Sequence, residues 1–198
     1  MKQSRFQALR VGELDLLPVC RECDAVPPGT SWAQAAVDRW GLCGMAAVAG
    51  RRVVGYVLIA PALNAPRRAA VARAPHQADS ALLLAAHVQP AQRRNGLGRA
   101  LVQGVAARLV RSGTPCIEAV GSVLGGTCAT PPLLWLEGVG FVVSVEHPIR
   151  PQLRLDLDRA VPWRLDLRAA WDRIAGAVVP PIAPPAPAGR ASRRSLRA

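Results

Sequence analysis

The sequence is poor in lysine, in aromatic residues and in long apolar runs. Lys2 is the only lysine among 25 basic residues, and aromatic residues make up 4% of the 198 positions. No apolar run reaches the ~18 residues that a membrane-spanning helix needs. The N-terminal segment lacks the uninterrupted apolar stretch of a secretory signal. We therefore expect a cytoplasmic protein without a membrane segment.

Two common phosphate-binding motifs and the pattern of a small disulfide scaffold are also absent. The glycines at 96 and 98 are not followed by the Lys-Ser/Thr pair of a P-loop, and the third glycine of a dinucleotide-binding fingerprint is missing. The five cysteines are odd in number and follow no secreted framework, which agrees with a reducing compartment. The chain contains no internal repeats.

What the sequence does contain is the composition of a globular domain with a basic surface. Apolar residues make up 51%, charged residues 19%, and the formal net charge is +12. Such a chain can bury a substantial core, and its charge favours anionic partners.

The stretch 81–113 organises the rest of the chain. An apolar run over 81–88 predicts a strand, and leucine or valine at 97, 101, 105 and 109 predicts a helix. Arg93, Arg94, Gly96 and Gly98 lie between the two. A glycine turn at a helix N-terminus leaves main-chain N–H groups unpaired, and arginines add positive charge. The pattern predicts a pyrophosphate site.

These residues resemble the acetyl-CoA-binding motif of the GNAT acyltransferase family. Arg93-Arg94-Asn95-Gly96-Leu97-Gly98 fits the family pattern Arg/Gln-x-x-Gly-x-Gly/Ala and follows Val88-x-Pro90. A second segment, Leu136-Glu137-Gly138-Val139-Gly140-Phe141, resembles the family signature Tyr-Glu-x-x-Gly-Phe. The resemblance covers roughly residues 5 to 158.

The expected fold is α/β (α+β), a mixed and mostly antiparallel central sheet flanked by helices, as in GNAT domains. We place this domain at 1–160, an amphipathic C-terminal helix at 161–179 and a disordered Pro/Ala/Arg-rich tail at 180–198. Expected strands cover 5–10, 45–49, 52–60, 81–88, 116–120, 139–147 and 153–157. Expected helices cover 11–24, interrupted at Pro18, then 31–40 with Ser31 as N-cap, a helix beginning at 97, and 133–137.

The resemblance implies transfer of an acetyl group from acetyl-CoA to an amine of a small molecule or peptide, by direct attack in a ternary complex. It implies that Ala86, His87 and Val88 lie along the pantetheine and acetyl group. It further implies that Arg93, Arg94, Asn95, Gly96, Leu97, Gly98 and Arg99 surround the pyrophosphate. Monomer and homodimer are both left open.

The family's usual proton-transfer residues are missing. Leu136 replaces the tyrosine acid, and Leu82 occupies the position where some members have a glutamate base. We therefore consider His87 and Glu118 as catalytic residues, each weighed against a structural role. Tyr56 and Cys128 are weaker substitutes, and a water relay is a further alternative.

The remaining cysteines and histidines have less specific patterns. Cys20-x-x-Cys23 with Cys43 and Cys128 would form a four-thiolate zinc site only if the fold gathers them. A redox pair is also open, but packing cysteines are the preferred interpretation, so no metal is expected. His76 and His147 are expected at the surface.

Two other functions compete with acetyl transfer. A non-catalytic domain that binds or senses acetyl-CoA agrees with Leu82 and Leu136. An arginine-rich nucleic-acid-binding module is disfavoured, because aromatic residues for stacking are few and the arginines concentrate in the tail. Any nucleic-acid contact is expected from that tail.

Overall fold

The computed structural model describes residues 5–20, 26–66 and 76–157. Cys23, the expected C-terminal helix at 161–179 and the expected tail at 180–198 lie outside these ranges. Of the helices within them, none combines the length and the apolar character that crossing a membrane requires.

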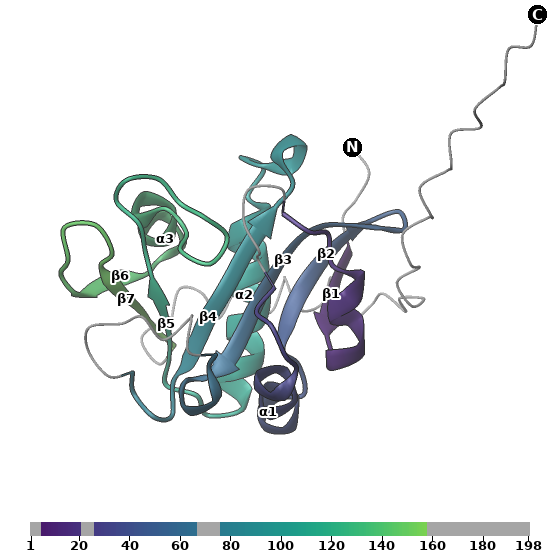
Figure 1. Cartoon of the computed structure of the whole chain (residues 1–198), viewed down its shortest axis with the longest axis horizontal. Coiled ribbons are helices and arrows are strands. Elements are labelled where there is room, and N and C mark those ends of the chain that lie inside the picture. Colours follow the sequence, from purple (N-terminus) through teal and green to yellow (C-terminus); the bar gives the residue numbers. More distant parts are fainter. Residues whose placement is uncertain (1–4, 21–25, 67–75, 158–198) are drawn as a thin grey trace, which may run out of the picture.

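A seven-stranded sheet forms the centre of the fold (Figure 1). Its spatial order is β1-β2-β3-β4-β5-β7-β6, and every neighbouring pair is antiparallel except β4 and β5. The strands are β1 (Arg5–Leu9), β2 (Gly44–Ala49), β3 (Arg52–Pro61), β4 (Ala81–Val88), β5 (Cys116–Val120), β6 (Val142–Val145) and β7 (Gln152–Asp156). The mixed, mostly antiparallel sheet expected from the sequence is confirmed.

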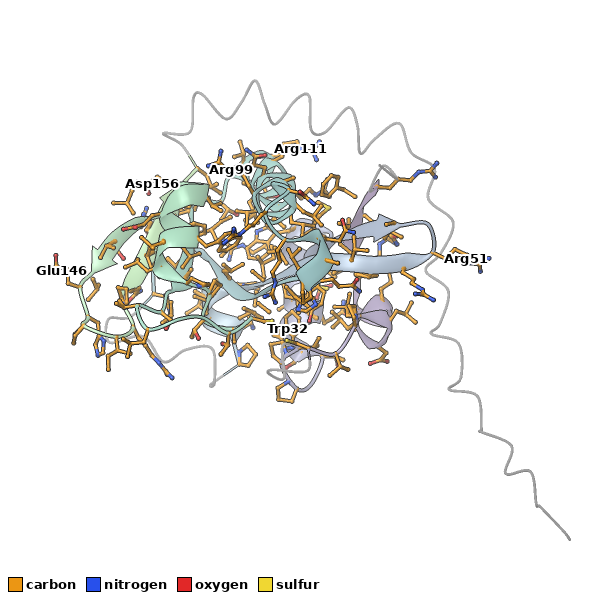
Figure 2. All side chains as sticks on the ribbon, turned by 90° about the horizontal axis from the view of Figure 1, so that it is seen from above. Trp32, Arg51, Arg99, Arg111, Glu146 and Asp156 are labelled. Carbon is orange, nitrogen blue, oxygen red and sulfur yellow. The ribbon has the colours of Figure 1, made fainter. Side chains whose placement is uncertain are left out.

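Helices cover both faces of this sheet. They are α1 (Ser31–Trp40), α2 (Leu97–Arg111) and α3 (Leu133–Val139), with short 3₁₀ helices η1 (Val11–Leu16), η2 (Ala62–Asn64) and η3 (Pro90–Gln92). Figure 2 shows Arg99 of α2 and Trp32 of α1 on opposite sides of the sheet, and Arg51 and Glu146 at its two ends. The core lies between these layers and includes β3 from Val53 onward, which is buried on both faces.

Local sequence explains where α1 and α2 begin and end. Gly41 ends α1 in the left-handed conformation (φ 77°), and its N–H donates to Val37 C=O at 2.7 Å. Gly96 precedes α2 with φ 73°, a conformation that costs a glycine nothing. Both glycines were recognisable in the sequence as helix boundaries.

Three local predictions need correction. Within residues 11–20, the described part of the segment expected as a helix from 11 to 24, only a 3₁₀ helix that ends at Leu16 forms, because the chain turns extended at Leu17 before Pro18. Ser31 is the first residue of α1, and Thr30 occupies the N-cap without a side-chain hydrogen bond. The short helix expected at 133–137 extends to Val139 and ends at Gly140.

Candidate functional site

The loop between β4 and α2 presents main-chain N–H groups to solvent. Ala100 N–H donates to Gly96 C=O at 3.0 Å, so the N–H groups of Leu97, Gly98 and Arg99 have no acceptor within the helix. A Cβ added to Gly96 would meet no atom within 4 Å. The helix dipole and this open space together are features that favour the binding of an anion.

Arg94, two residues earlier, also adopts the left-handed conformation, with φ 64°. A non-glycine residue in this region costs of order 1 kcal/mol and persists only where the surroundings hold it. The side chain of the preceding Arg93 is anchored, because its Nε donates to Val88 C=O at 3.0 Å. The loop is therefore held against the end of β4.

A cavity of about 690 Å³ opens beside this loop. Its wall includes the residues predicted to contact the cofactor, Ala86, His87, Val88, Arg93, Arg94, Gly96, Leu97, Gly98 and Arg99. Asn95, also predicted, is exposed and lies outside the lining set. Among the described residues, the lining contains three arginines and no carboxylate, which favours an anionic ligand. Its volume suits a cofactor-sized ligand.

The cavity extends along β4 because β4 and β5 pair only at their beginnings. Their register stops at Leu82 and Glu118, whereas β4 continues to Val88. Gln89 N–H bonds to Val54 C=O on β3, and hydrogen-bonded residues alternate along an antiparallel strand. The main-chain groups of Ala86 and Val88 therefore point away from β3, toward the cavity. Ala86 N–H is bonded to Cys128 C=O at 2.8 Å.

Helix α3 forms a second wall of the cavity. A Cβ on Gly98 would come within 3.0 Å of Trp135 Cζ2, so the indole lies directly against the first turn of α2. Arg99 also donates from its guanidinium to Gly138 C=O. Leu136, which replaces the family's tyrosine, is completely buried and faces the core. Residues of the second sequence signature thus line the cavity without supplying an acid.

His87 lies on the face of the sheet opposite α2. Gly55 faces α2, since a Cβ there would lie 3.4 Å from Leu101, and Tyr56 therefore faces the other side. Tyr56 pairs with His87 across β3 and β4, and their rings stack with centroids 5.2 Å apart. His87 Nδ1 is 3.3 Å from Cys128 Sγ. Three of the four side chains considered for proton transfer, those of Tyr56, His87 and Cys128, thus lie in the cavity wall.

Glu118 lies outside the cavity lining, in a polar cluster on β5. It is bonded to His76 Nδ1, accepts the main-chain N–H of Gln77 at 3.0 Å and accepts Gln152 Nε2 at 3.1 Å. Burial by itself would raise the pKa of Glu118, but these hydrogen bonds outweigh it and lower the pKa below its ordinary value. Glu118 is therefore an ionised carboxylate at neutral pH.

His76 belongs to this cluster, so the prediction of a surface histidine is wrong. Its side chain is 9% exposed, and within the described residues its buried Nε2 has no hydrogen-bond partner. Sequence reasoning missed the pair because His76 and Glu118 are far apart in the chain and share no spacing pattern.

The four cysteines within the described ranges do not assemble as one thiolate set. Cys43 Sγ donates to Leu9 C=O at 3.4 Å, and burial raises its pKa to about 12. Burial likewise raises the pKa of Cys116 to about 11. The Sγ atoms of Cys20 and Cys128 instead lie close to a ring nitrogen of His87, all within 4.8 Å of one another.

Among solved structures, the fold of this chain is similar to that of several acetyltransferases. The chain matches PaiA N-acetyltransferase from Thermoplasma acidophilum, in complex with coenzyme A, with a TM-score of 0.51 and 13% identity, covering 78% of this chain and 99% of that one. It matches YncA from Salmonella typhimurium, solved with its cofactor acetyl-CoA, with a TM-score of 0.54 and 15% identity (79% and 95% covered). A protein assigned to the GNAT acetyltransferase family from Desulfovibrio desulfuricans matches with a TM-score of 0.51 and 19% identity, covering 78% of this chain and 98% of that one.

The sequence itself matches no family model and no curated protein. At these identities the structural likeness establishes the architecture, and chemistry has to be argued from the site. The chain has the GNAT acetyltransferase fold, which confirms the fold that the sequence motifs predicted.

Proposed function

We propose that this protein transfers the acetyl group of acetyl-CoA to an amine of a small molecule or peptide. The observation that carries the proposal is the cavity at the N-terminus of α2, whose described lining includes Arg93, Arg94 and Arg99 and no carboxylate. A diphosphate fits there, because the space beside Gly96 is open and the first N–H groups of the helix face it. The solved GNAT-fold structures that contain coenzyme A or acetyl-CoA support this assignment.

The chain's own groups would position the two substrates. The pyrophosphate would bind at Gly96, Leu97 and Gly98, and the pantetheine would lie along the edge of β4 at Ala86 and Val88. The acceptor amine would approach from the face of the sheet that carries His87, opposite α2. It would then attack the thioester carbonyl of acetyl-CoA directly, at the edge of β4. Holding both reactants in one cavity supplies much of the rate of such a reaction.

Two side chains are candidates for accepting the proton of the amine. His87 lies in the cavity wall, and Glu118 would act through water because it lies outside the lining. Leu82 and Leu136 are 1% and 0% exposed and carry no proton, so neither contributes. At saturating acetyl-CoA, we expect the variant that removes the true proton acceptor, H87A or E118Q, to lose turnover at least tenfold while it retains coenzyme affinity.

Calorimetry with coenzyme A and acetyl-CoA, followed by thiol release with a panel of amines, tests the proposal. Binding of both compounds and amine-dependent release of one thiol per acetylated product are expected. Direct attack predicts that acetyl-CoA alone leaves the mass of the chain unchanged, whereas an acetyl-enzyme would add one acetyl group. Absence of any coenzyme binding contradicts the proposal.

A non-catalytic acetyl-CoA-binding domain is the second candidate, and the burial of Leu82 and Leu136 favours it. The same experiment separates the two functions. Tight binding of acetyl-CoA without thiol release for any amine would support the binding domain.

A further inference from the structure

Cys20, His87 and Cys128 meet beside the cavity although they come from separate parts of the chain, and two of them, His87 and Cys128, line it. Cys20 follows η1, His87 lies on β4, and Cys128 lies in the connection after β5. All three are at most 8% exposed, and one potential ligand atom from each lies within 4.8 Å of the other two. Within the described residues, no other group of three His, Cys, Asp or Glu side chains comes this close.

We propose that Cys20, His87 and Cys128 bind a zinc ion. In a tetrahedral zinc site, Zn–S distances of ~2.3 Å and Zn–N distances of ~2.0 Å separate neighbouring ligand atoms by roughly 3.5–3.8 Å. The His87 Nδ1 to Cys128 Sγ distance is 3.3 Å, and the group spans at most 4.8 Å. Shifts of a few tenths of an ångström to about 1 Å bring all three atoms to zinc-binding distances.

The chemistry of the three side chains selects zinc over the common hard cations. Thiolate and imidazole ligands suit zinc, whereas calcium and magnesium prefer oxygen. Two thiolates and a neutral imidazole also cancel the charge of a divalent ion. A neutral complex is the arrangement that a buried site tolerates best. Binding releases the two thiol protons to solvent.

Neighbouring contacts already hold these ligands in place. The C=O of Cys128 accepts Ala86 N–H at 2.8 Å, which fixes the connection after β5 against β4. Tyr56 stacks on the His87 ring, and the Tyr56 hydroxyl donates to Pro18 C=O at 3.5 Å, near Cys20. Zinc would therefore tie the N-terminal segment and the connection 121–132 to the strand that borders the cavity.

The zinc site has consequences for the acetyl transfer proposed above, although it does not depend on that activity. Zinc sites with three protein ligands keep a fourth position for water or another ligand, and His87 and Cys128 both line the cavity. An imidazole whose Nδ1 holds zinc keeps its proton on Nε2 and cannot accept another. In the zinc-bound protein, Glu118 remains as the predicted proton acceptor.

Metal analysis of the untagged full-length chain tests the proposal. We expect about one zinc per chain in the wild type, and at least tenfold less in C20S and C128S after dialysis against the same buffer. C43S and C116S are matched controls, because each removes a buried thiol outside the cluster, and both should keep the wild-type zinc content. Removal of zinc should lower the thermal midpoint of the wild type by about 5 °C and have a much smaller effect on C128S.

A cobalt-exchanged wild type provides a readout that requires no variant to fold. Thiolate ligands should give intense cobalt charge-transfer absorption that zinc removes. A metal-free wild type without these bands, or zinc content unchanged in both C20S and C128S, overturns the proposal. Coenzyme A binding is measured on the same samples. Intact coenzyme binding without zinc binding would contradict the zinc site and leave the acetyl-transfer proposal in place. Zinc binding without coenzyme binding would contradict acetyl transfer and leave the zinc site in place.

Discussion

Gly98 of α2 lies against the indole of Trp135 of α3, so closely that even one added methyl group would come within 3.0 Å of Trp135 Cζ2. The absence of a side chain at position 98 thus allows α3 to close over the first turn of α2. Both residues line the cavity, and their contact sets its width at the predicted phosphate site.

We expect G98A to lower the free energy of unfolding by about 1–2 kcal/mol, because the cost of displacing Trp135 exceeds the gain of alanine over glycine in a helix. Displacement of this wall should also weaken coenzyme A binding about tenfold. Denaturant unfolding and calorimetry measure the two effects. G138A is the control for stability, because a Cβ there meets no atom within 4 Å and should be neutral or slightly stabilising. An equally stable G98A would contradict the close contact.

A carboxylate at position 96 should prevent coenzyme A from binding. G96D places negative charge in the open space beside the N-terminus of α2, and like charges in an interface cost several kcal/mol. We expect coenzyme affinity to fall at least 30-fold, as measured by calorimetry.

G113D is the matched control for this variant. Gly113 has a similar backbone conformation (φ 70° against 73°) and equally open space, but it follows the far end of α2 and does not line the cavity. The strain of a side chain in the left-handed conformation should cost each variant about 1 kcal/mol of stability. The dipole of α2 should make G113D, at the negative end of the helix, the less stable of the two. Equal coenzyme affinity in G96D and G113D would refute the phosphate site.

The turn between β4 and α2 could be predicted from sequence because its pattern is local. Gly96, Gly98 and the two arginines lie within six residues, and the periodic leucines that follow fix the start of the helix. The end of α1 at Gly41 follows from an equally local pattern. Asn95 was included as a position of the motif, and its absence from the described lining shows that a short motif does not reveal which side chains face the cavity.

The clusters around His87 and Glu118 could not be predicted in the same way. Cys20, His87 and Cys128 belong to three distant segments, and their meeting depends on how irregular connections fold over the sheet. His76 sits in a loop with no periodicity, yet it is bonded to a carboxylate on β5. The cavity lies where β4 and β5 separate, which is a property of the strand register and leaves no pattern in either strand alone.

The lowered pKa of Glu118 predicts how stability depends on pH. A folded-state pKa below the unfolded value of about 4.3 means that the ionised carboxylate stabilises the folded chain above pH 4.3. That contribution is lost as the pH falls through the folded-state pKa. E118Q should therefore be less stable than the wild type at pH 7 by about 1.5–3 kcal/mol, the usual range for hydrogen bonds to a charged group. The difference in stability should shrink below pH 4.

Denaturant unfolding of both proteins between pH 3 and pH 7 measures this difference. E146Q is the control, since Glu146 is exposed in the turn between β6 and β7. Its stability should stay within about 0.5 kcal/mol of the wild type throughout. If the difference in unfolding free energy between E118Q and the wild type does not depend on pH, then His76, Gln77 and Gln152 do not hold Glu118 as a carboxylate.

The buried thiols of Cys43 and Cys116 should be almost inert toward alkylation in the folded protein. Burial raises their pKa values to about 12 and about 11, so that roughly one Cys116 thiol in a thousand is ionised at pH 8. With iodoacetamide at pH 8, we expect both to react at least 100-fold more slowly than free cysteine, as followed by peptide mass spectrometry. In denaturant, where burial is lost, both should react at the rate of free cysteine. Rapid labelling of either residue in the folded chain would show that its side chain is accessible to solvent and that burial does not control its ionisation.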